Sequence, residues 1–389
     1  MNKYLYIFLT CILLAACSSE STIEEVKNIT ESTDPMRFTG SGVSEEVEIP
    51  TRASAPLTTG FMVSCWKAYG IASQQDVMEK YRVEYKVDGW SNKSSWNYVG
   101  VNGQYEKYWD YSNFPYRFHA IAPSPANPNN FILKDNKLTI SATYKSQTCH
   151  NGTITNPDAE PYLLAQVQRN TDGSDHDIFA GKEIGNGSTT KNREVALPFH
   201  HLNSKVRFGV YTTDYWATDN KLYIEGLTIK VTSPDFATEA TSYTTTGTNS
   251  WMIDNGYSGF AGLTKTTNFQ LLQFDGGPAL TGNDLRVCQG RSSAYMLQCP
   301  DGIMQLPQEN IKMTVSFNLM KEGSSTPYKT YTDVPIKLED NTEIFQWHTG
   351  YIHTYYLILG PFDKLSLTFT ATLTPWEDIN GSLSTDLEK

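Results

Sequence analysis

Apolar and polar residues alternate along several short stretches of the chain. Residues 365–373 show this most clearly, and residues 227–231 and 312–319 repeat the period of two. A strand places successive side chains on opposite faces, so the pattern predicts strands with one face on a core and the other in water. In the clearest stretch, serine and threonine separate five apolar residues, which are Leu365, Leu367, Phe369, Ala371 and Leu373.

Turn-forming residues interrupt these stretches often, and long helical periodicity is missing. Tyrosine, which suits pleated sheets, occurs 23 times. Short pieces such as residues 75–81 are the only ones whose pattern fits a helix. Many short strands with turn-rich joints predict an all-β protein built from β-sandwiches.

The length of the chain favours two domains. A chain of 389 residues is long for a single core. A strand-like run at residues 204–211 gives way to polar residues before the next strand begins. We therefore expect one β-sandwich over residues 53–214 and a second over residues 215–389.

The first 52 residues differ from the rest. Lys3 and a short apolar stretch lead to Leu14, Ala15, Ala16 and Cys17, which is the pattern of a secretory signal with a bacterial lipobox. The stretch is shorter than the roughly 20 apolar residues of a membrane span. This predicts a signal peptide over residues 1–16 and a lipid anchor on Cys17, although an ordinary signal with an incidental cysteine is the alternative. Residues 17–52 are polar and acidic and are expected to act as a tether or propeptide.

The net charge limits the kinds of partner that the chain could bind, and the cysteine spacing limits what its cysteines could do. The net charge of −11 argues against nucleic acid as a partner and fits a cell-surface protein. Cys65, Cys149, Cys288 and Cys299 follow the signal without a metal-binding spacing. An oxidising compartment permits disulfides, and the candidate pair is Cys288 with Cys299, because a hairpin could bring them together.

No catalytic motif occurs in the sequence, so neither an enzyme nor a cofactor is expected. Asp172, Asp175 and Asp177 could hold calcium through oxygen ligands, but a solvated loop is the favoured interpretation because the EF-hand order is missing. His200 and His201 would face opposite sides of a strand, so we expect no shared metal. Aromatic residues could stack on sugars, although such residues more often fill sandwich cores.

Several motifs, each weak alone, follow one another in a specific order. The order resembles the fimbrillin family of Bacteroidetes, whose FimA-like and Mfa-like members form major and minor fimbria. Besides the lipobox at Cys17, the motifs are Phe38, residues 51–53 (TRA), 116–123 (YRFHAIAP), 197–206 (LPFHHLNSKV), 303–308 (IMQLPQ), 347–355 (WHTGYIHTY) and 373–376 (LTPW).

The resemblance implies a structural subunit of a surface fimbrium, or pilus, that supports adhesion. Family members have two transthyretin-like β-sandwich domains and reach the outer membrane as lipoproteins. An Arg-specific protease then removes the N-terminal segment with its first strand, and another fimbrial subunit inserts a strand in its place. Such insertion pairs the open strand edge and fills the apolar groove together, and contacts that do not close on themselves give filaments.

Carried onto this sequence, the resemblance places the cut between Arg52 and Ala53, so that residues 38–49 would leave. Arg37 is a second candidate, and an uncut linker arginine is the alternative. The candidate donor strand lies at residues 365–373, which could instead be the last strand of the second sandwich. The polar tail at residues 377–389 would be a weak donor. Shaft, anchor and tip positions all remain open, as does the adhesive ligand.

The competing hypothesis is a monomeric outer-membrane lipoprotein that binds glycans and keeps its lipid at Cys17. It predicts rows of exposed tryptophan or tyrosine side chains. The fimbrial hypothesis predicts cleavage at Arg52 and a polymer.

Overall fold

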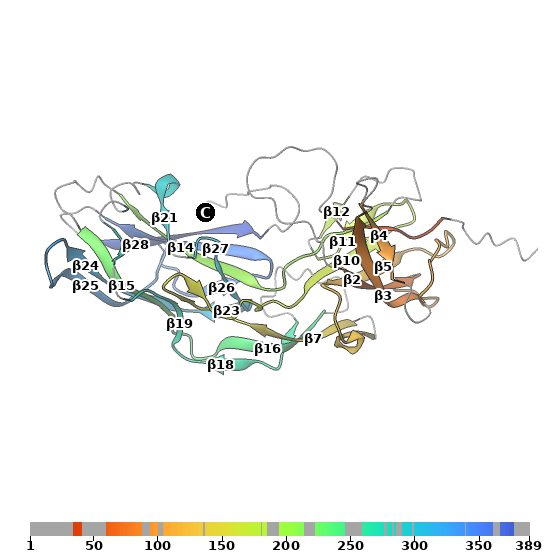
Figure 1. Ribbon diagram of the computed structural model, residues 1–389, viewed down its shortest axis with the longest axis horizontal. Coiled ribbons are helices and arrows are strands. Elements are labelled where there is room, and N and C mark those ends of the chain that lie inside the picture. Colours follow the sequence, from red (N-terminus) through yellow and green to blue (C-terminus); the bar gives the residue numbers. More distant parts are fainter. Residues whose placement is uncertain are drawn as a thin grey trace, which may run out of the picture.

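The computed structural model confirms an all-β protein (Figure 1). Residues 75–81, for which the sequence suggested a helix, lie in a strand instead, because tertiary pairing with a neighbouring strand overrides the weak local preference. No helix in the described part of the chain is long and apolar enough to cross a membrane. The structure describes residues 34–40, 60–87, 94–99, 104–134, 137–179, 181–184, 194–213, 222–245, 259–275, 278–281, 284, 290–297, 299–338, 340–360 and 366–376.

One end of the molecule is built on a seven-stranded antiparallel sheet, shown on the right in Figure 1. We call this sheet and the strands packed on it the N-terminal region. In sheet order its strands are β12 (Lys182–Ile184), β11 (Asp175–Asp177), β10 (Leu163–Arg169), β5 (Tyr116–Ala122), β2 (Phe61–Lys67), β3 (Gln75–Val87) and β4 (Ser94–Tyr98).

The layer opposite this sheet holds a two-stranded parallel ladder. It joins β1 (Phe38–Gly40) to β13 (Val195–Leu197), with Phe38 opposite Val195. Side chains from both layers meet in one apolar cluster that contains Phe38, Phe61 and Phe118. Two segments far apart in sequence therefore close this core.

The other end of the molecule is a sandwich of two sheets, which we call the C-terminal region. One sheet contains β21 (Tyr295–Met296), β14 (Ser204–Thr212), β27 (Tyr351–Leu359) and β28 (Leu367–Pro375), with β22 (Ile303–Gln305) also paired to β14. The other contains β25 (Pro327–Pro335), β24 (Met313–Lys321), β15 (Leu222–Val231), β19 (Phe269–Gln273), β8 (Cys149–His150) and β9 (Thr153–Ile154), with β20 (Pro278–Leu280) paired to β15.

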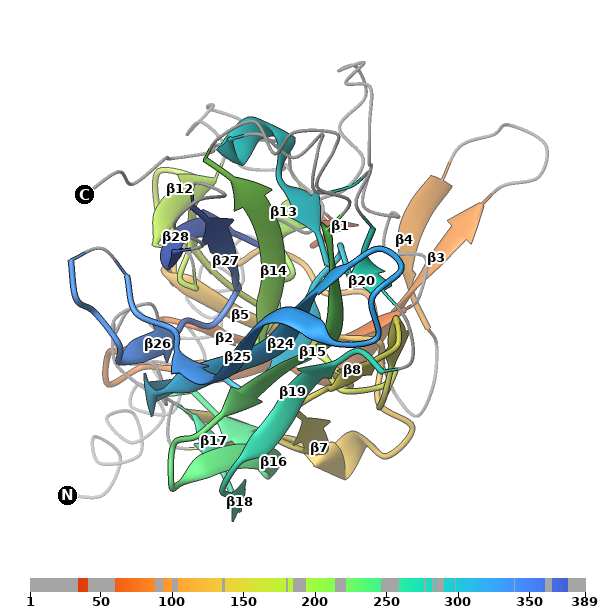
Figure 2. The ribbon, with the colours of Figure 1, turned by 90° about the vertical axis from the view of Figure 1, so that its left-hand side faces the viewer.

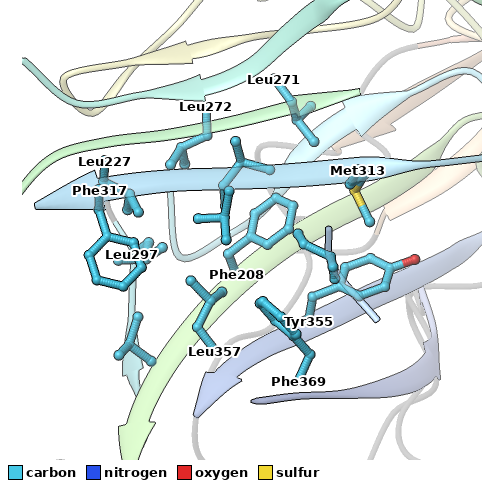
Figure 3. Packing of buried hydrophobic residues seen from close by; sticks show 14 of the residues in the cluster. Phe208, Leu227, Leu271, Leu272, Leu297, Met313, Phe317, Tyr355, Leu357 and Phe369 are labelled. Carbon is cyan, nitrogen blue, oxygen red and sulfur yellow. The ribbon is translucent and has the colours of Figure 1, made fainter. Parts of the chain in front are cut away.

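Alternating side chains of these two sheets form the core between them (Figure 3). Phe208 of β14, Leu357 of β27 and Phe369 of β28 face Met313 and Phe317 of β24. The period of two in residues 312–319 and 365–373 therefore arises as the sequence predicts, from one apolar face on a core.

A third layer lies below this sandwich in Figure 2. It contains β17 (Phe260–Ala261), β16 (Phe236–Thr244), β7 (Lys137–Lys145) and β6 (Phe131–Lys134), with β18 (Thr264–Thr266) paired to β16. A short ladder joins β23 (Gln308–Ile311) to β26 (Phe345–Trp347). The remaining described elements are two 3₁₀ helices, η2 (Pro128–Asn130) and η3 (Arg291–Ser293).

Strand pairing crosses the expected domain boundary at residue 214 in three places. β7 and β8 precede that boundary, yet they pair with β16 and β19 beyond it. β14 also precedes it and pairs with β27. The two-domain division at residues 53–214 and 215–389 stays a prediction. The pairing adds that the segment 131–154, which comes before the boundary, joins sheets made from strands that follow it.

The candidate disulfide between Cys288 and Cys299 is wrong. Cys299 is bonded to Cys149, 150 residues earlier in the chain. The physical reason is the parallel pairing of β8 with β19, which carries Cys149 into the C-terminal region. Cys288 lies outside the described residues, and Cys65 is a free, buried thiol.

Candidate strand-exchange groove

Residues 34–40 run as an extended segment between two other parts of the chain. On one side, the Met36 amide donates a hydrogen bond to the Lys107 carbonyl at 2.6 Å, and the Trp109 amide donates to the Asp34 carbonyl at 3.1 Å. On the other side, the Val195 amide donates to the Arg37 carbonyl at 2.7 Å. The segment is therefore hydrogen-bonded along both edges, like an inner strand.

The side chains of this segment alternate between core and solvent. Met36 and Phe38 are 0% and 3% exposed, whereas Arg37 between them is exposed. The Phe38 ring makes edge contacts with Phe61 and Phe118, at centroid distances of 5.8 and 5.9 Å. Such pairs add about 0.5–1.5 kcal/mol each beyond the burial of area.

Two tyrosine hydroxyls hold the segment by its polar atoms. Tyr98 donates to the Met36 carbonyl at 2.6 Å, and Tyr111 donates to an Asp34 carboxylate oxygen at 2.9 Å. Burial raises the pKa of the Tyr98 phenol far above its usual value, so the hydroxyl stays protonated and able to donate.

β1 and β13 together cover this core on the side opposite the seven-stranded sheet. β1 is the only ladder partner of β13 in the described part of the chain. Removal of residues 34–40 would take the Phe38 ring away from Phe61 and Phe118 and would leave the Val195 amide without its acceptor. Unpaired strand edges and an open apolar groove are what an inserted strand can satisfy.

Cys65 offers a probe of the groove, by which we mean the part of the N-terminal core that residues 34–40 cover. Its side chain is fully buried in the same apolar cluster as Phe38, and burial raises the pKa of its thiol. A buried, protonated thiol reacts slowly, whereas one exposed by an open groove would react faster.

The maturation residues predicted from the sequence lie outside the described residues. These are Cys17, Arg52 and Ala53. The described chain resumes at Gly60, directly before β2, so the predicted cut falls between β1 and β2. A cut at that point would separate β1 from the rest of the N-terminal region.

The candidate donor strand corresponds to β28, apart from Leu365, which is outside the described residues. β28 pairs antiparallel with β27 over nine residues, and the Phe369 side chain is buried in the core of the C-terminal region. Leu367 and Ala371 pack against the same core, and Leu373 lies opposite His353. This pairing favours the other interpretation, that the segment is the last strand of its own sandwich.

The acidic cluster at residues 172–177 serves the fold, and the expectation of a solvated loop is wrong for two of its members. Asp175 and Asp177 are 0% exposed. Asp175 makes two bonds to the Arg169 guanidinium, at 2.7 and 2.8 Å, and Asp177 bonds His200 at 2.8 Å. These partners occupy the carboxylates, and the described residues contain no group of three potential metal ligands.

Some residues of the groove carried no clear signal in the sequence. Trp109 and Lys107 lie in an irregular segment, and Val195 lies in a strand of three residues. The polar-apolar alternation around Phe38 is equally short. Only the family resemblance pointed to this part of the chain.

The match to a protein-family model agrees with the resemblance. A family model described as fimbrillin-like matches residues 51–376. No curated protein matches the chain. Among solved structures, a fimbrial protein from Bacteroides vulgatus is 14% identical, with a TM-score of 0.49, over 82% of this chain and 93% of that one. The tip fimbrial protein Mfa3 from Porphyromonas gingivalis, truncated at its C-terminus, is 8% identical, with a TM-score of 0.29, over 88% of this chain and 98% of that one.

Proposed function

Because the chain belongs to the fimbrillin-like family, we propose that it is a subunit of a surface fimbrium that supports adhesion and is assembled by strand exchange. In this proposal β1 is the strand that leaves, and a strand from another fimbrial subunit takes its place. The observation that carries the proposal is the position of residues 34–40, which close the N-terminal core between β13 and residues 104–109.

The energetics support replacement rather than simple loss of β1. Two buried apolar side chains, the ladder with β13 and three further main-chain hydrogen bonds hold the segment. Burying a side chain of this size contributes about 1.5–3 kcal/mol. A groove left open would forfeit that energy, so an arriving strand with similar side chains would bind there readily.

Maturation is proposed to follow the sequence of events that the family implies. The precursor is exported as a lipoprotein with its lipid on Cys17 and reaches the outer membrane. An Arg-specific protease cuts after Arg52, and the mature subunit begins at Ala53. No catalytic role is proposed for the chain itself.

The donor strand is the less supported part of the proposal. Donation of residues 365–373 would break the whole ladder with β27 and withdraw Phe369 from its core. The pairing supports a subunit whose β28 stays in place, with the inserted strand supplied by a different segment or a different subunit.

The N-terminal residue of the protein in sheared surface material tests the proposal. Mass spectrometry is expected to find Ala53 in the native chain. An Arg52→Gln variant should keep its lipid-modified Cys17 and stay with the membrane, whereas the matched Arg37→Gln variant should still begin at Ala53. A lipid-modified Cys17 on all of the native protein would contradict a cleaved shaft subunit and favour an anchor subunit or a monomeric glycan-binding lipoprotein.

A further inference from the structure

The outer face of the sheet that contains β14, β27 and β28 carries a distinct set of side chains. Phe208, Tyr355 and Leu357 point into the core (Figure 3). The residues that alternate with them point away from it, and the parallel register of β14 and β27 places them in rows. These rows pair Arg207 with Thr354 and Gly209 with Tyr356. The Arg207 and Tyr356 side chains are half-buried, whereas Thr354 is fully buried between them.

Tyr356 forms an aromatic platform on this face. A Cβ atom at Gly209 would lie 2.8 Å from the Tyr356 ring, so only glycine lets the ring lie against the strand. The Tyr211 ring meets it at 61° with a centroid distance of 6.0 Å. The ring is thus held in one orientation by the sheet beneath it and by a neighbouring ring.

Two arginines stand beside the platform without a carboxylate partner in the described part of the chain. The Arg207 Nε donates to the Thr354 hydroxyl at 2.7 Å, and the guanidinium carbon of Arg291 lies 5.6 Å from the centroid of the Tyr356 ring. Two cations side by side contrast with the net charge of −11 for the whole chain.

The neighbouring strand adds a row of hydroxyl groups. Threonines alternate with the core residues of β28, and the register places Thr370 opposite Tyr356 and Thr372 opposite Thr354. Hydroxyls both donate and accept hydrogen bonds, as sugar hydroxyls do. We call the surface made by Arg207, Arg291, Tyr356, Thr370 and Thr372 the arginine face.

We propose that the arginine face binds an anionic polysaccharide. The carboxylate or sulfate groups of the polymer accept hydrogen bonds from Arg207 and Arg291, and the Tyr356 ring orients Arg291, whose guanidinium lies over it. Guanidinium groups match such oxygens in geometry and charge, and the threonine row meets the sugar hydroxyls. This inference goes beyond the fimbrial proposal and does not depend on strand exchange or on cleavage at Arg52.

Binding of the purified full chain to three immobilised polymers tests the proposal. Polygalacturonate presents carboxylates, dextran sulfate presents sulfates, and neutral dextran presents neither. We expect the native chain to bind at least one of the charged polymers and not dextran, and added salt should weaken that binding. Which charged polymer binds identifies the anionic group.

Variants connect the binding to the arginine face. Arg207→Gln and Arg291→Gln should each weaken binding roughly tenfold, because each removes a charge-assisted hydrogen bond. The matched control is a chain with Lys265→Gln and Lys337→Gln, two half-exposed cations outside this face, which removes the same charge as the double arginine variant. Tyr356→Phe should bind like the native chain, and Tyr356→Leu should bind more weakly.

Three results would overturn the proposal. One is a native chain that binds neither charged polymer, and another is equal binding to neutral dextran. The third is a double arginine variant that binds as tightly as the lysine control. Thermal unfolding of each variant, matched to the native chain, separates lost binding from lost folding.

Discussion

The N-terminal and C-terminal regions close their cores in different ways. The N-terminal core depends on residues 34–40, which are joined to the rest of that region through a stretch that holds the predicted cut. The C-terminal core is closed by long ladders, such as the one between β27 and β28, and by the disulfide from Cys149 to Cys299. A single cut at Arg52 could release the segment that closes the first core, whereas β28 of the second core is held by a nine-residue ladder with β27.

The difference connects architecture with assembly. A subunit that exchanges a strand needs one region that opens and one that stays folded while it does so. The short parallel ladder of β1 offers few hydrogen bonds, and its apolar anchors are concentrated in Met36 and Phe38. Exchange is therefore expected to be local, and we expect the C-terminal region to stay folded during it.

Phe38→Ala is expected to produce the largest difference in stability between the two regions. Loss of a buried phenylalanine costs about 3–5 kcal/mol, and here the loss falls on the segment that closes the N-terminal core. Regional hydrogen exchange should show faster exchange in β2 and β5 and little change in β24 and β27. The control is Arg37→Ala, whose side chain is exposed. Equal acceleration in both regions would mean that the two cores unfold as one unit.

Removal of the disulfide should weaken the opposite region. A chain with Cys149→Ala and Cys299→Ala is expected to lose about 2–4 kcal/mol, because the bond restricts the unfolded chain. The loss should appear in the exchange of β15 and β19 and should leave the reactivity of Cys65 unchanged. Faster labelling of Cys65 in this variant would contradict the independence of the two regions.

Tyr98→Phe tests how much one hydrogen bond to the segment 34–40 contributes, and its effect should be smaller. The substitution removes the hydroxyl that donates to the Met36 carbonyl and keeps the ring beside Phe38. A buried hydrogen bond of this kind contributes about 1 kcal/mol. We expect a small rise in Cys65 labelling, well below that of Phe38→Ala. Denaturant unfolding followed by the tyrosine and tryptophan signals gives an independent value.

Acid should lower the stability of both regions to a similar extent, because each contains one buried histidine with a lowered pKa. The two regions should therefore differ least in their pH dependence. Burial, with a smaller contribution from Arg117, lowers the pKa of His119 to about 3 in the N-terminal region. Burial, with a smaller contribution from His348, lowers the pKa of His353 to about 3 in the C-terminal region. An unfolded histidine titrates near 6.5, so between about pH 6.5 and pH 3 the unfolded chain binds protons that the native chain does not.

Stability contributed by these neutral histidines is therefore present above about pH 6.5 and is lost progressively as the pH falls toward 3. Urea unfolding at a series of pH values checks this. His119→Gln and His353→Gln should each flatten the dependence in their own region. A dependence that neither substitution alters would assign the acid sensitivity to other groups.

Local patterns in the sequence predicted the strands but not the way they pair. The alternation in residues 365–373 became β28, with the apolar face on a core as expected. Nothing local distinguishes a partner that is close in sequence from one that is distant, so the pairing of β8 with β19 and the resulting disulfide were missed. The same limit applies to the ladder of β1 with β13, which involves only three residues on each strand.

Burial of charged groups was equally hard to foresee. Asp175 and Asp177 read as loop residues, because carboxylates are seldom buried without partners. Their partners, Arg169 and His200, lie on a neighbouring strand and beyond it, and only the folded chain brings them together. Only the resemblance to the fimbrillin family singled out Phe38, because the short sequence pattern around it does not.

The reactivity of Cys65 tests most directly the central claim that residues 34–40 close a groove that can open. A thiol reagent would be applied to the full chain and to a chain that begins at Ala53, and mass spectrometry would measure modification of the peptide that contains Cys65. The account predicts slow modification in the full chain, fast modification in the shortened chain, and renewed protection when a synthetic peptide of residues 34–49 is added. Equal, slow modification of both chains would show that β1 does not close the core, and would contradict the account.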